Sequence, residues 1–323
     1  MNGTDSVRGG GPAEERDHTN QIVVGIDGSP SSRAALDCAA RQAAGRGLGL
    51  LLLHAPSMPV FAAPFGHPVP ATPSPDVVDR AERLLRQAVD HVARTHTDLS
   101  VQTSVSSLGP EPALLAAART ASIVVVGARG MGGFTSALLG SVSIRLSAHA
   151  ACPVAVVPEP APEADSGDRT PVRRGCVVVG LDGSYGSEEA LRYAFEEAAR
   201  TGAELVAVHA WRVPAPLDTT AFTAYVAAVD HEYLVMRADK YVRELVEEVR
   251  SEDTAKVSVR ITVVEDQPAH ALLAEAAGAD LVVVGSRGRG GFTGLLLGSV
   301  SQTVLHHAPV PVVVVRDRFH SAR

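Results

Sequence analysis

The chain contains one sequence pattern twice, and this repeat constrains its architecture more than any other feature. Residues 22–29 read IVVGIDGS and residues 177–184 read VVVGLDGS, an offset of 155 residues. Further along, residues 127–143 align with residues 285–301 at an offset of 158, with thirteen of seventeen positions identical. This period is far longer than a solenoid repeat of about 20 to 45 residues. The chain is therefore predicted to be a duplicated domain, and its 323 residues suit two domains of about 150 residues each.

Within each copy, short β-branched runs alternate with helical stretches. Runs such as IVVV at 123–126 and LVVV at 281–284 are continuously apolar, which is typical of parallel strands covered on both faces. The alternation predicts an α/β fold of two doubly wound domains, each a five-stranded parallel sheet flanked by helices. Helices are expected to start near Ser32, Asp76, Glu111 and Ser141 in the first copy. The expected strands are Ile22–Ile26, Leu50–His54, Val101–Ser106, Ile123–Val126 and Val154–Val157, then Val177–Leu181, Leu205–His209, Val257–Val264, Leu281–Val284 and Val312–Val315.

The segments outside the repeats set the domain limits. We expect domains at residues 21–158 and 175–316, joined by a proline-containing linker at 159–174. Residues 1–20 are expected to be a disordered tail, and residues 317–323 a second tail. Residues 56–75 hold seven prolines, which predicts an extended loop after the second strand.

Composition excludes several classes of protein. With 46% hydrophobic residues the chain can build cores, and its net charge of −7 argues against nucleic acid as the main partner. A run of about 18 apolar residues, the length of a membrane-spanning helix, is absent, so we expect no membrane insertion. The three cysteines form no CxxC pair, which predicts reduced, buried thiols and a cytoplasmic protein.

The fourth expected strand of each copy leads into a glycine-rich loop. The first loop reads Gly127-x2-Gly130-x9-Gly140-Ser141, and the second has the same spacing. Ligands of doubly wound sheets bind beyond the carboxyl ends of the strands, where the strand order reverses. Glycines permit positive φ and close approach to a ligand, successive amides form an anion-binding nest, and the following helix N-terminus favours phosphate. We expect hydroxyls to add donors and to cap that helix at Ser141, Ser143, Ser299 and Ser301.

Acidic and basic side chains flank this predicted phosphate site. Asp27 and Asp182 lie in Asp-Gly-Ser turns at the same sheet edge, where a carboxylate can accept hydrogen bonds from ribose hydroxyls. Such a turn can also simply start a helix, but its presence in both copies favours a functional role. Arg129 and Arg287 lie inside the loops and either offset phosphate charge or are solvated surface residues. Walker-type and dinucleotide-type motifs are absent, which argues against those two modes of nucleotide binding.

With these motifs the chain resembles the universal stress protein family, in a tandem two-domain form of its ATP-binding branch. The family motif G-x2-G-x9-G-[S/T] is complete in both copies. The resemblance implies an adenine nucleotide alpha hydrolase-like fold, ATP bound with a divalent cation such as Mg²⁺, and a role in binding or signalling. It also implies antiparallel pairing of the fifth strands, Val154–Val157 with Val312–Val315, and a homodimer.

The same resemblance implies one ATP site per domain. Asp27 and Asp182 would contact the nucleoside, and the backbone at Ala55 and Ala210 would line the adenine pocket. Many family members have valine at these two alanines. The remaining ATP-binding residues would be Gly127, Arg129, Gly130, Gly140, Ser141, Val142 and Ser143, with Gly285, Arg287, Gly288, Gly298, Ser299, Val300 and Ser301 in the second domain.

Rival functions use the same pocket. A fast ATP-dependent enzyme needs a base near the γ-phosphate, yet residues 127–143 and 285–301 contain no acid, histidine or lysine. We therefore expect no catalytic residues and at most slow ATP hydrolysis. A sensor of AMP or cyclic AMP remains an alternative. His306 and His307 are adjacent on a predicted helix and point about 100° apart, so we expect no metal site there.

Overall fold

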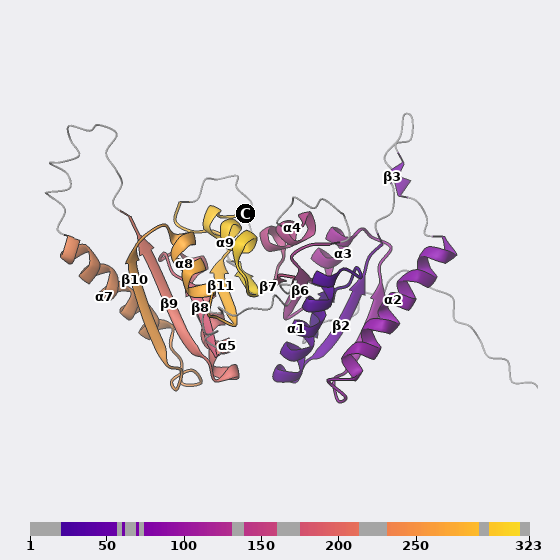
Figure 1. The fold of residues 1–323 in the computed structure, drawn as a ribbon, viewed down its shortest axis with the longest axis horizontal. Helices are drawn as coiled ribbons and strands as arrows, with labels where there is room; N and C mark the ends of the chain where they lie inside the picture. Colours follow the sequence, from indigo (N-terminus) through magenta and orange to yellow (C-terminus); the bar gives the residue numbers. More distant parts are fainter. Residues whose placement is uncertain are drawn as a thin grey trace, which may run out of the picture.

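The computed structural model describes residues 21–56, 60–61, 69–70, 74–130, 139–159, 175–212, 231–290 and 297–316. Within these residues, ten strands form one continuous sheet that helices cover on both faces (Figure 1). The strand order is β10-β9-β8-β11-β12-β7-β6-β1-β2-β5. Each half of this sheet is one domain.

The first domain contains the five strands that the valine and leucine runs predict. Its strands lie parallel to one another, in the order β7-β6-β1-β2-β5. Proline opens three of its helices, because its fixed φ suits the first helical turn. The elements are β1 (Gln21–Gly25), α1 (Pro30–Arg46), β2 (Gly49–His54), α2 (Pro75–Ala93), β5 (Val101–Val105), α3 (Pro110–Ala117), β6 (Ile123–Gly127), α4 (Ser141–His149) and β7 (Val154–Val157).

The second domain repeats this arrangement with the same connections. Its strands are again parallel, in the order β10-β9-β8-β11-β12. The elements are β8 (Cys176–Gly180), α5 (Tyr185–Thr201), β9 (Glu204–Trp211), α7 (His231–Val249), β10 (Val259–Glu265), α8 (Pro268–Ala276), β11 (Leu281–Gly285), α9 (Ser299–His307) and β12 (Val312–Val315). The predicted fold class is confirmed.

The strand order reverses beside the first strand of each domain. β1 pairs with β2 on one side and with β6 on the other, and Ile22 is opposite both Leu50 and Ile123. β8 occupies the same position between β9 and β11. The loops that follow β1 and β6 therefore meet at one edge of the sheet, as do those that follow β8 and β11.

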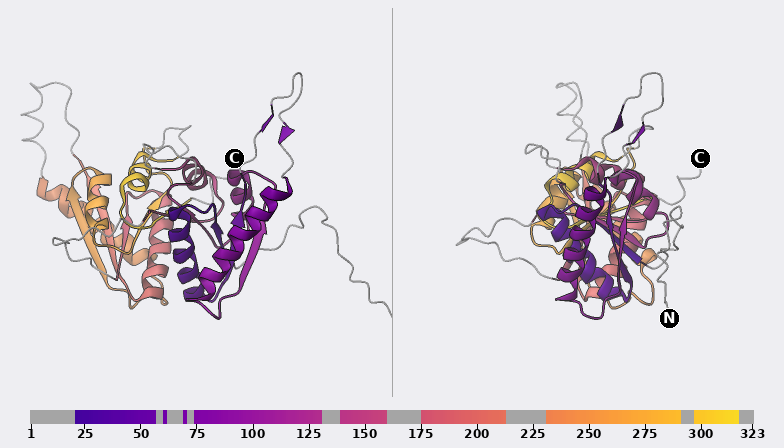
Figure 2. Two further views of the ribbon diagram at one scale, coloured as in Figure 1. Left: turned by 45° about the vertical axis from the view of Figure 1, so that its right-hand side comes forward. Right: turned by 90° about the vertical axis from the view of Figure 1, so that its right-hand side faces the viewer.

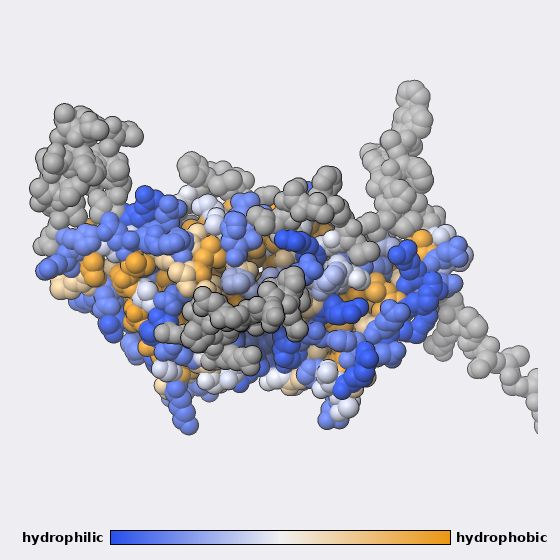
Figure 3. All heavy atoms as spheres, in the orientation of Figure 1, coloured by the Kyte–Doolittle hydropathy of each residue, from blue (hydrophilic) through white to orange (hydrophobic). Residues whose placement is uncertain are grey.

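Two helical layers sandwich the sheet (Figure 2). Strand residues alternate between them: Ile22 and Val24 pack with α1 and α2, while Val23 packs with α3 and α4. The second domain places α5 and α7 on the first face, and α8 and α9 on the second. In α2 the buried residues are three or four positions apart, and the outer face is mostly hydrophilic (Figure 3).

The two domains join edge to edge through their last strands. β12 pairs antiparallel with β7, with Val312 opposite Val156 and Val314 opposite Val154. Val156 and Val314 are only 2% and 1% exposed, so this junction is part of the core.

The proline-rich segment that follows β2 contains a short hairpin. Residues 56–75 are predicted to be an extended loop, and inside this segment two short strands, β3 (Val60–Phe61) and β4 (Val69–Pro70), pair antiparallel. Proline has no backbone N–H, so a strand tolerates it where that group would point away from the partner strand. The predicted tails and most of the predicted linker lie outside the described residues.

All three cysteines, Cys38, Cys152 and Cys176, are buried as predicted, and none is part of a disulfide. None of the described helices is long and apolar enough to cross a bilayer.

Candidate functional site

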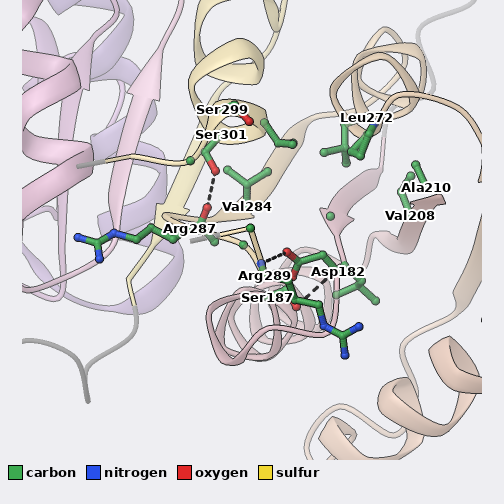
Figure 4. A pocket seen from close by; sticks show the side chains of 18 of the residues that line it. Asp182, Ser187, Val208, Ala210, Leu272, Val284, Arg287, Arg289, Ser299 and Ser301 are labelled. Carbon is green, nitrogen blue, oxygen red and sulfur yellow. Dashed lines mark hydrogen bonds between the residues drawn. The ribbon is translucent and has the colours of Figure 1, made fainter. Parts of the chain in front are cut away.

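The second domain has a cavity of about 310 Å³ where the strand order reverses (Figure 4). This volume lies at the lower end of the roughly 300 to 1,000 Å³ that small-molecule sites occupy. The lining comes from the ends of β8, β9 and β11, from α8, and from the N-terminus of α9. The cavity thus lies at the sheet edge that the strand pattern predicts.

One wall of the cavity is apolar. Val208 and Ala210 project from β9, Leu272 comes from α8, and Val284 comes from β11 (Figure 4). Ala210 is a predicted site residue, and Ala55 of the first domain packs against the same helical layer. This wall can hold a flat apolar ring.

The contribution of α8 to that wall was not predicted. Leu272 reaches the cavity because Gly180, the last residue of β8, leaves room for it: a Cβ at Gly180 would lie 3.0 Å from the Leu272 Cδ1. Gly25 and Leu114 have the same relationship in the first domain, where that distance is 3.2 Å. The repeat offset of 158 aligns Leu114 with Leu272 and was the available signal for this pair.

The motif glycines allow the loop to lie directly against the turn and the first helix, where a side chain would not fit. A Cβ at Gly127 would lie 2.6 Å from the Ser31 carbonyl carbon, and one at Gly130 would lie 2.8 Å from Asp27 Oδ2. The same clashes arise at Gly285, against the backbone of Gly186, and at Gly288, against Asp182 Oδ2. These four glycines do not have positive φ; in the site motifs positive φ occurs at Gly28 and Gly183, in the Asp-Gly-Ser turns. The loop is therefore packed directly onto the turn and the first helix of its domain.

Asp182 ties the turn to the loop. Its Oδ1 accepts hydrogen bonds from the Ser184 amide at 3.0 Å and hydroxyl at 2.6 Å, and its Oδ2 accepts from the Arg289 amide at 2.9 Å. Asp27 Oδ1 similarly accepts from the Ser29 amide at 2.9 Å. Burial raises the pKa of the Asp182 carboxyl, but the bonds from Ser184 and Arg289 outweigh it and leave the pKa below its usual value. Asp182 is therefore a stably ionised anchor for the loop.

The Asp-Gly-Ser turns also start helices, the second role that the sequence allows for this motif. Ser29 and Ser184 are the N-cap residues of α1 and α5, and their hydroxyls accept from the Ser32 and Ser187 amides at 3.1 Å and 3.2 Å. The turn and the anchor are thus two uses of one motif: serine caps the helix while aspartate faces the loop.

The helices after the loops begin differently from the prediction. Gly140 and Gly298 occupy the N-cap positions of α4 and α9, so the prediction that serines cap these helices is wrong. Glycine has no side chain to accept from the first-turn amides, and neither helix has a side-chain cap bond. Those amides keep the partial positive charge of a helix N-terminus, which favours an anion.

The four motif serines divide into two pairs. Ser143 and Ser301 are buried, and their hydroxyls donate to the carbonyls of Gly127 at 2.8 Å and Gly285 at 2.6 Å. These hydroxyl hydrogens are used inside the fold, where they hold the helix under the end of the strand. Ser141 and Ser299 are instead exposed at the first position of α4 and α9. In the second domain Ser299, Val300 and Ser301 all line the cavity.

The loop arginines lie at the edge of the site. Arg129 and Arg287 are exposed. In Figure 4 the Arg287 side chain points away from the apolar wall, which fits the interpretation of a surface residue. Arg289, which was not predicted, lies with its guanidinium 5.9 Å from the Tyr241 ring centre.

The first domain brings its predicted residues to the corresponding edge. Asp27 accompanies Gly127 and Gly130, and Gly140 approaches the loop backbone, where an added Cβ would lie 3.3 Å from the Ala128 carbonyl oxygen. Loop residues 131–138 lie outside the described residues, as do residues 291–296 in the second domain.

The sequence matches known proteins of one family. A sequence profile of the Universal stress protein family matches residues 18–158 and 175–316. A universal stress protein of Mycobacterium tuberculosis (strain ATCC 25618 / H37Rv) is 38% identical over 303 residues, which cover 92% of this chain and 97% of the relative. One of Mycolicibacterium smegmatis is 39% identical over 301 residues, with 92% and 97% covered.

A solved structure is similar over most of the length of the chain. The crystal structure of a universal stress protein from Archaeoglobus fulgidus covers 93% of this chain and 99% of its own, with a TM-score of 0.57 and 22% identity. That likeness supports the fold, and the profile and the relatives establish the family. This chain belongs to the universal stress protein family, with two of its domains in tandem.

Proposed function

We propose that this protein binds ATP together with Mg²⁺, one nucleotide in each domain, and acts as a nucleotide-dependent protein of the stress response. The observation that supports this best is the composition of the second-domain cavity. An apolar wall at Val208, Ala210 and Leu272 faces the uncapped N-terminus of α9. An adenine nucleotide has the same two parts, a flat apolar base and an anionic tail.

The charges of the site orient the nucleotide. Adenine packs on the apolar wall, with the backbone at Ala210 beside it. The phosphates lie over Gly298 and the amides of Ser299 and Val300, where the helix dipole favours negative charge. Asp182 follows β8, and its ionised carboxylate would repel a phosphate group. The ribose, not the phosphates, therefore lies beside it. Asp27 and the Gly127–Gly140 loop play the same parts in the first domain.

Mg²⁺ enters with the phosphates. Magnesium prefers octahedral oxygen ligands and commonly keeps several waters when it binds with nucleotide phosphates. Asp182 already accepts three hydrogen bonds, and in the described residues no group of three or more His, Cys, Asp or Glu side chains could hold a metal ion. The nucleotide therefore supplies the charged ligands of the cation, which neutralises part of the phosphate charge.

Isothermal titration of ligand-stripped protein with Mg-ATP, AMP and cyclic AMP tests this function. We expect two ATP molecules per chain and weaker binding of AMP, because AMP has fewer phosphates to interact with the helix N-terminus. Tighter binding of AMP or cyclic AMP than of ATP would instead support the sensor alternative. Absence of binding by all three would refute the proposal.

We also expect ATP turnover to be slow or absent. The loops carry no acid, histidine or lysine that could serve as a base beside the γ-phosphate. Steady-state phosphate release from the purified protein measures this. Turnover within the range of roughly 1 to 1,000 per second that is common among enzymes would make this protein an ATPase.

A further inference from the structure

Each domain has a histidine near the carboxyl end of its second strand, and this histidine is hydrogen-bonded to the residue that directly follows the first strand. His54 Nδ1 lies 2.6 Å from the Ile26 carbonyl oxygen, and His209 Nδ1 lies 2.8 Å from the Leu181 carbonyl oxygen. The contact therefore recurs at matching positions, 155 residues apart. Ile26 and Leu181 directly precede Asp27 and Asp182.

The chemistry of this contact determines where the proton lies. A backbone carbonyl only accepts hydrogen bonds, so Nδ1 must carry the hydrogen. The contact consequently selects the Nδ1–H tautomer of the neutral ring. The amides of Ile26 and Leu181 donate to the carbonyls of Leu53 and Val208, each at 2.9 Å. Both backbone polar groups of the residue before the aspartate are therefore fixed to the neighbouring strand.

His209 acts from behind the cavity. Side chains alternate along β9, so Val208 and Ala210 line the cavity while Leu205 and Ala207 pack on the opposite face, with α5 and α7. By the same alternation His209 lies on that opposite face. It reaches the turn without occupying space that a ligand needs.

The contact continues through the aspartate to the phosphate loop. Leu181 leads into Asp182, whose Oδ2 accepts from the amide of Arg289 in the loop after β11. Gly288, next to Arg289, packs against the same oxygen atom. The ends of β9, β8 and β11 are thus connected in series by one imidazole and one carboxylate.

We propose that His54 and His209 are positioning residues for the nucleotide sites: each fixes the aspartate turn and, through it, the phosphate loop. We call the His209–Leu181–Asp182–Arg289 series the histidine strap. Its effect on affinity rests on the proposed nucleotide binding, whereas its effect on the loop does not.

The test uses two substitutions in the full chain, His209→Leu and His209→Asn. Leucine removes the donor, while the asparagine amide nitrogen can occupy about the position of Nδ1 and restore the bond. We measure hydrogen exchange of the Arg289 amide by NMR and Mg-ATP affinity by calorimetry. His209→Leu should speed the exchange and weaken binding at the second site about three- to tenfold, the value of one hydrogen bond. His209→Asn should restore both.

Two controls separate positioning from general stability. The first domain retains His54 in these variants, so its affinity should stay unchanged. His307→Leu removes an exposed histidine at the end of α9 and should alter neither site. Equal exchange rates and affinities in the leucine and asparagine variants would show that His209 only fills space, and would overturn the proposal.

A spectroscopic test is independent of nucleotide. Long-range ¹H–¹⁵N spectra of the ligand-free wild-type protein at about pH 8.5, above the ordinary range of histidine titration, report which ring nitrogen is protonated. Both His54 and His209 should be protonated at Nδ1, and protonation at Nε2 alone would overturn the strap. If wild-type protein bound no nucleotide, the proposed function would fail while the tautomer and the Arg289 exchange would still decide this inference.

Discussion

The two domains of this chain share the backbone of their sites and differ in the side chains around them. Gly28 and Gly183 have positive φ values of 90° and 76° in the same turn, and the buried serines of the motif make the same bonds. In contrast, Leu84 of α2 packs beside Gly28, where Tyr241 of α7 packs beside Gly183. The turns and close backbone contacts therefore define the site, whereas the side chains that surround it can differ between the two domains.

The junction between the domains shows an asymmetry with a clear purpose. The offset of 155 places Gln42 of α1 at the position of Glu197 of α5. Arg46 contacts both, with 3.2 Å to Gln42 Oε1 and 2.7 Å to Glu197 Oε2. Two glutamates here would bring like charges together in a buried place. The neutral residue in one copy thus makes the two helices complementary.

The largest effect should follow from breaking the pairing of β7 with β12. Val156→Asp combined with Val314→Asp places unpaired charges on both strands at positions that are almost fully buried. We expect a loss of at least about 3 to 5 kcal/mol of unfolding free energy, because neither charge has a partner. Thermal unfolding and limited proteolysis measure it, with Val156→Thr as a milder control. Unchanged protease resistance and domain packing would show that the junction is not needed.

Much of this fold could be predicted from the sequence, because its signals are local. Valine runs mark buried strands, and the helices of the first domain begin within two residues of the predicted starts at Ser32, Asp76, Glu111 and Ser141. The glycine spacing and the two aspartates likewise located the site. The role of Leu272 had only its repeat at Leu114 as a sequence signal, because its contact with the cavity depends on how α8 packs against β8. The cause of the glycine requirement, contact with Ser31 or Asp182, is also visible only in three dimensions.

A smaller effect, a loss of nucleotide affinity at the second site alone, is expected from Gly288→Ala. The added Cβ would overlap Asp182 Oδ2, so the loop must move and lose its bond from the Arg289 amide. We expect affinity for Mg-ATP at the second site to fall roughly 10- to 100-fold while the first site is retained. Titration should then show one tight site per chain.

Gly290→Ala is the matched control for that substitution. Within the described residues a Cβ at Gly290 meets no atom closer than 4 Å, so this variant should bind two nucleotides with wild-type affinity. Equal losses in the two variants would mean that any change in the loop disrupts binding. The close contact with Asp182 would then not be the cause.

At the junction, Glu197→Gln makes the second domain resemble the first. Glu197 is nearly buried and pairs with both Arg46 and Arg200, which would lose their carboxylate. We expect a loss of about 1 to 2 kcal/mol, measured by urea unfolding. Glu189→Gln, which removes an exposed pair with Arg192 on the same helix, should cost less than about 1 kcal/mol. Equal costs would show that the junction pair acts as an ordinary surface pair.

The smallest effect should come from Arg289→Met, which replaces the second-domain residue by its first-domain counterpart, Met131. The contact that holds the loop is the amide of residue 289, which methionine retains. The guanidinium lies over Tyr241, and such a contact at an exposed site is worth about 0.5 to 1 kcal/mol. Affinity for Mg-ATP should therefore change by less than about fivefold. A loss as large as that of Gly288→Ala would mean that the guanidinium itself binds the nucleotide. In that case the second site would depend on a charge that Met131 cannot supply, and the two domains would bind nucleotide by different means.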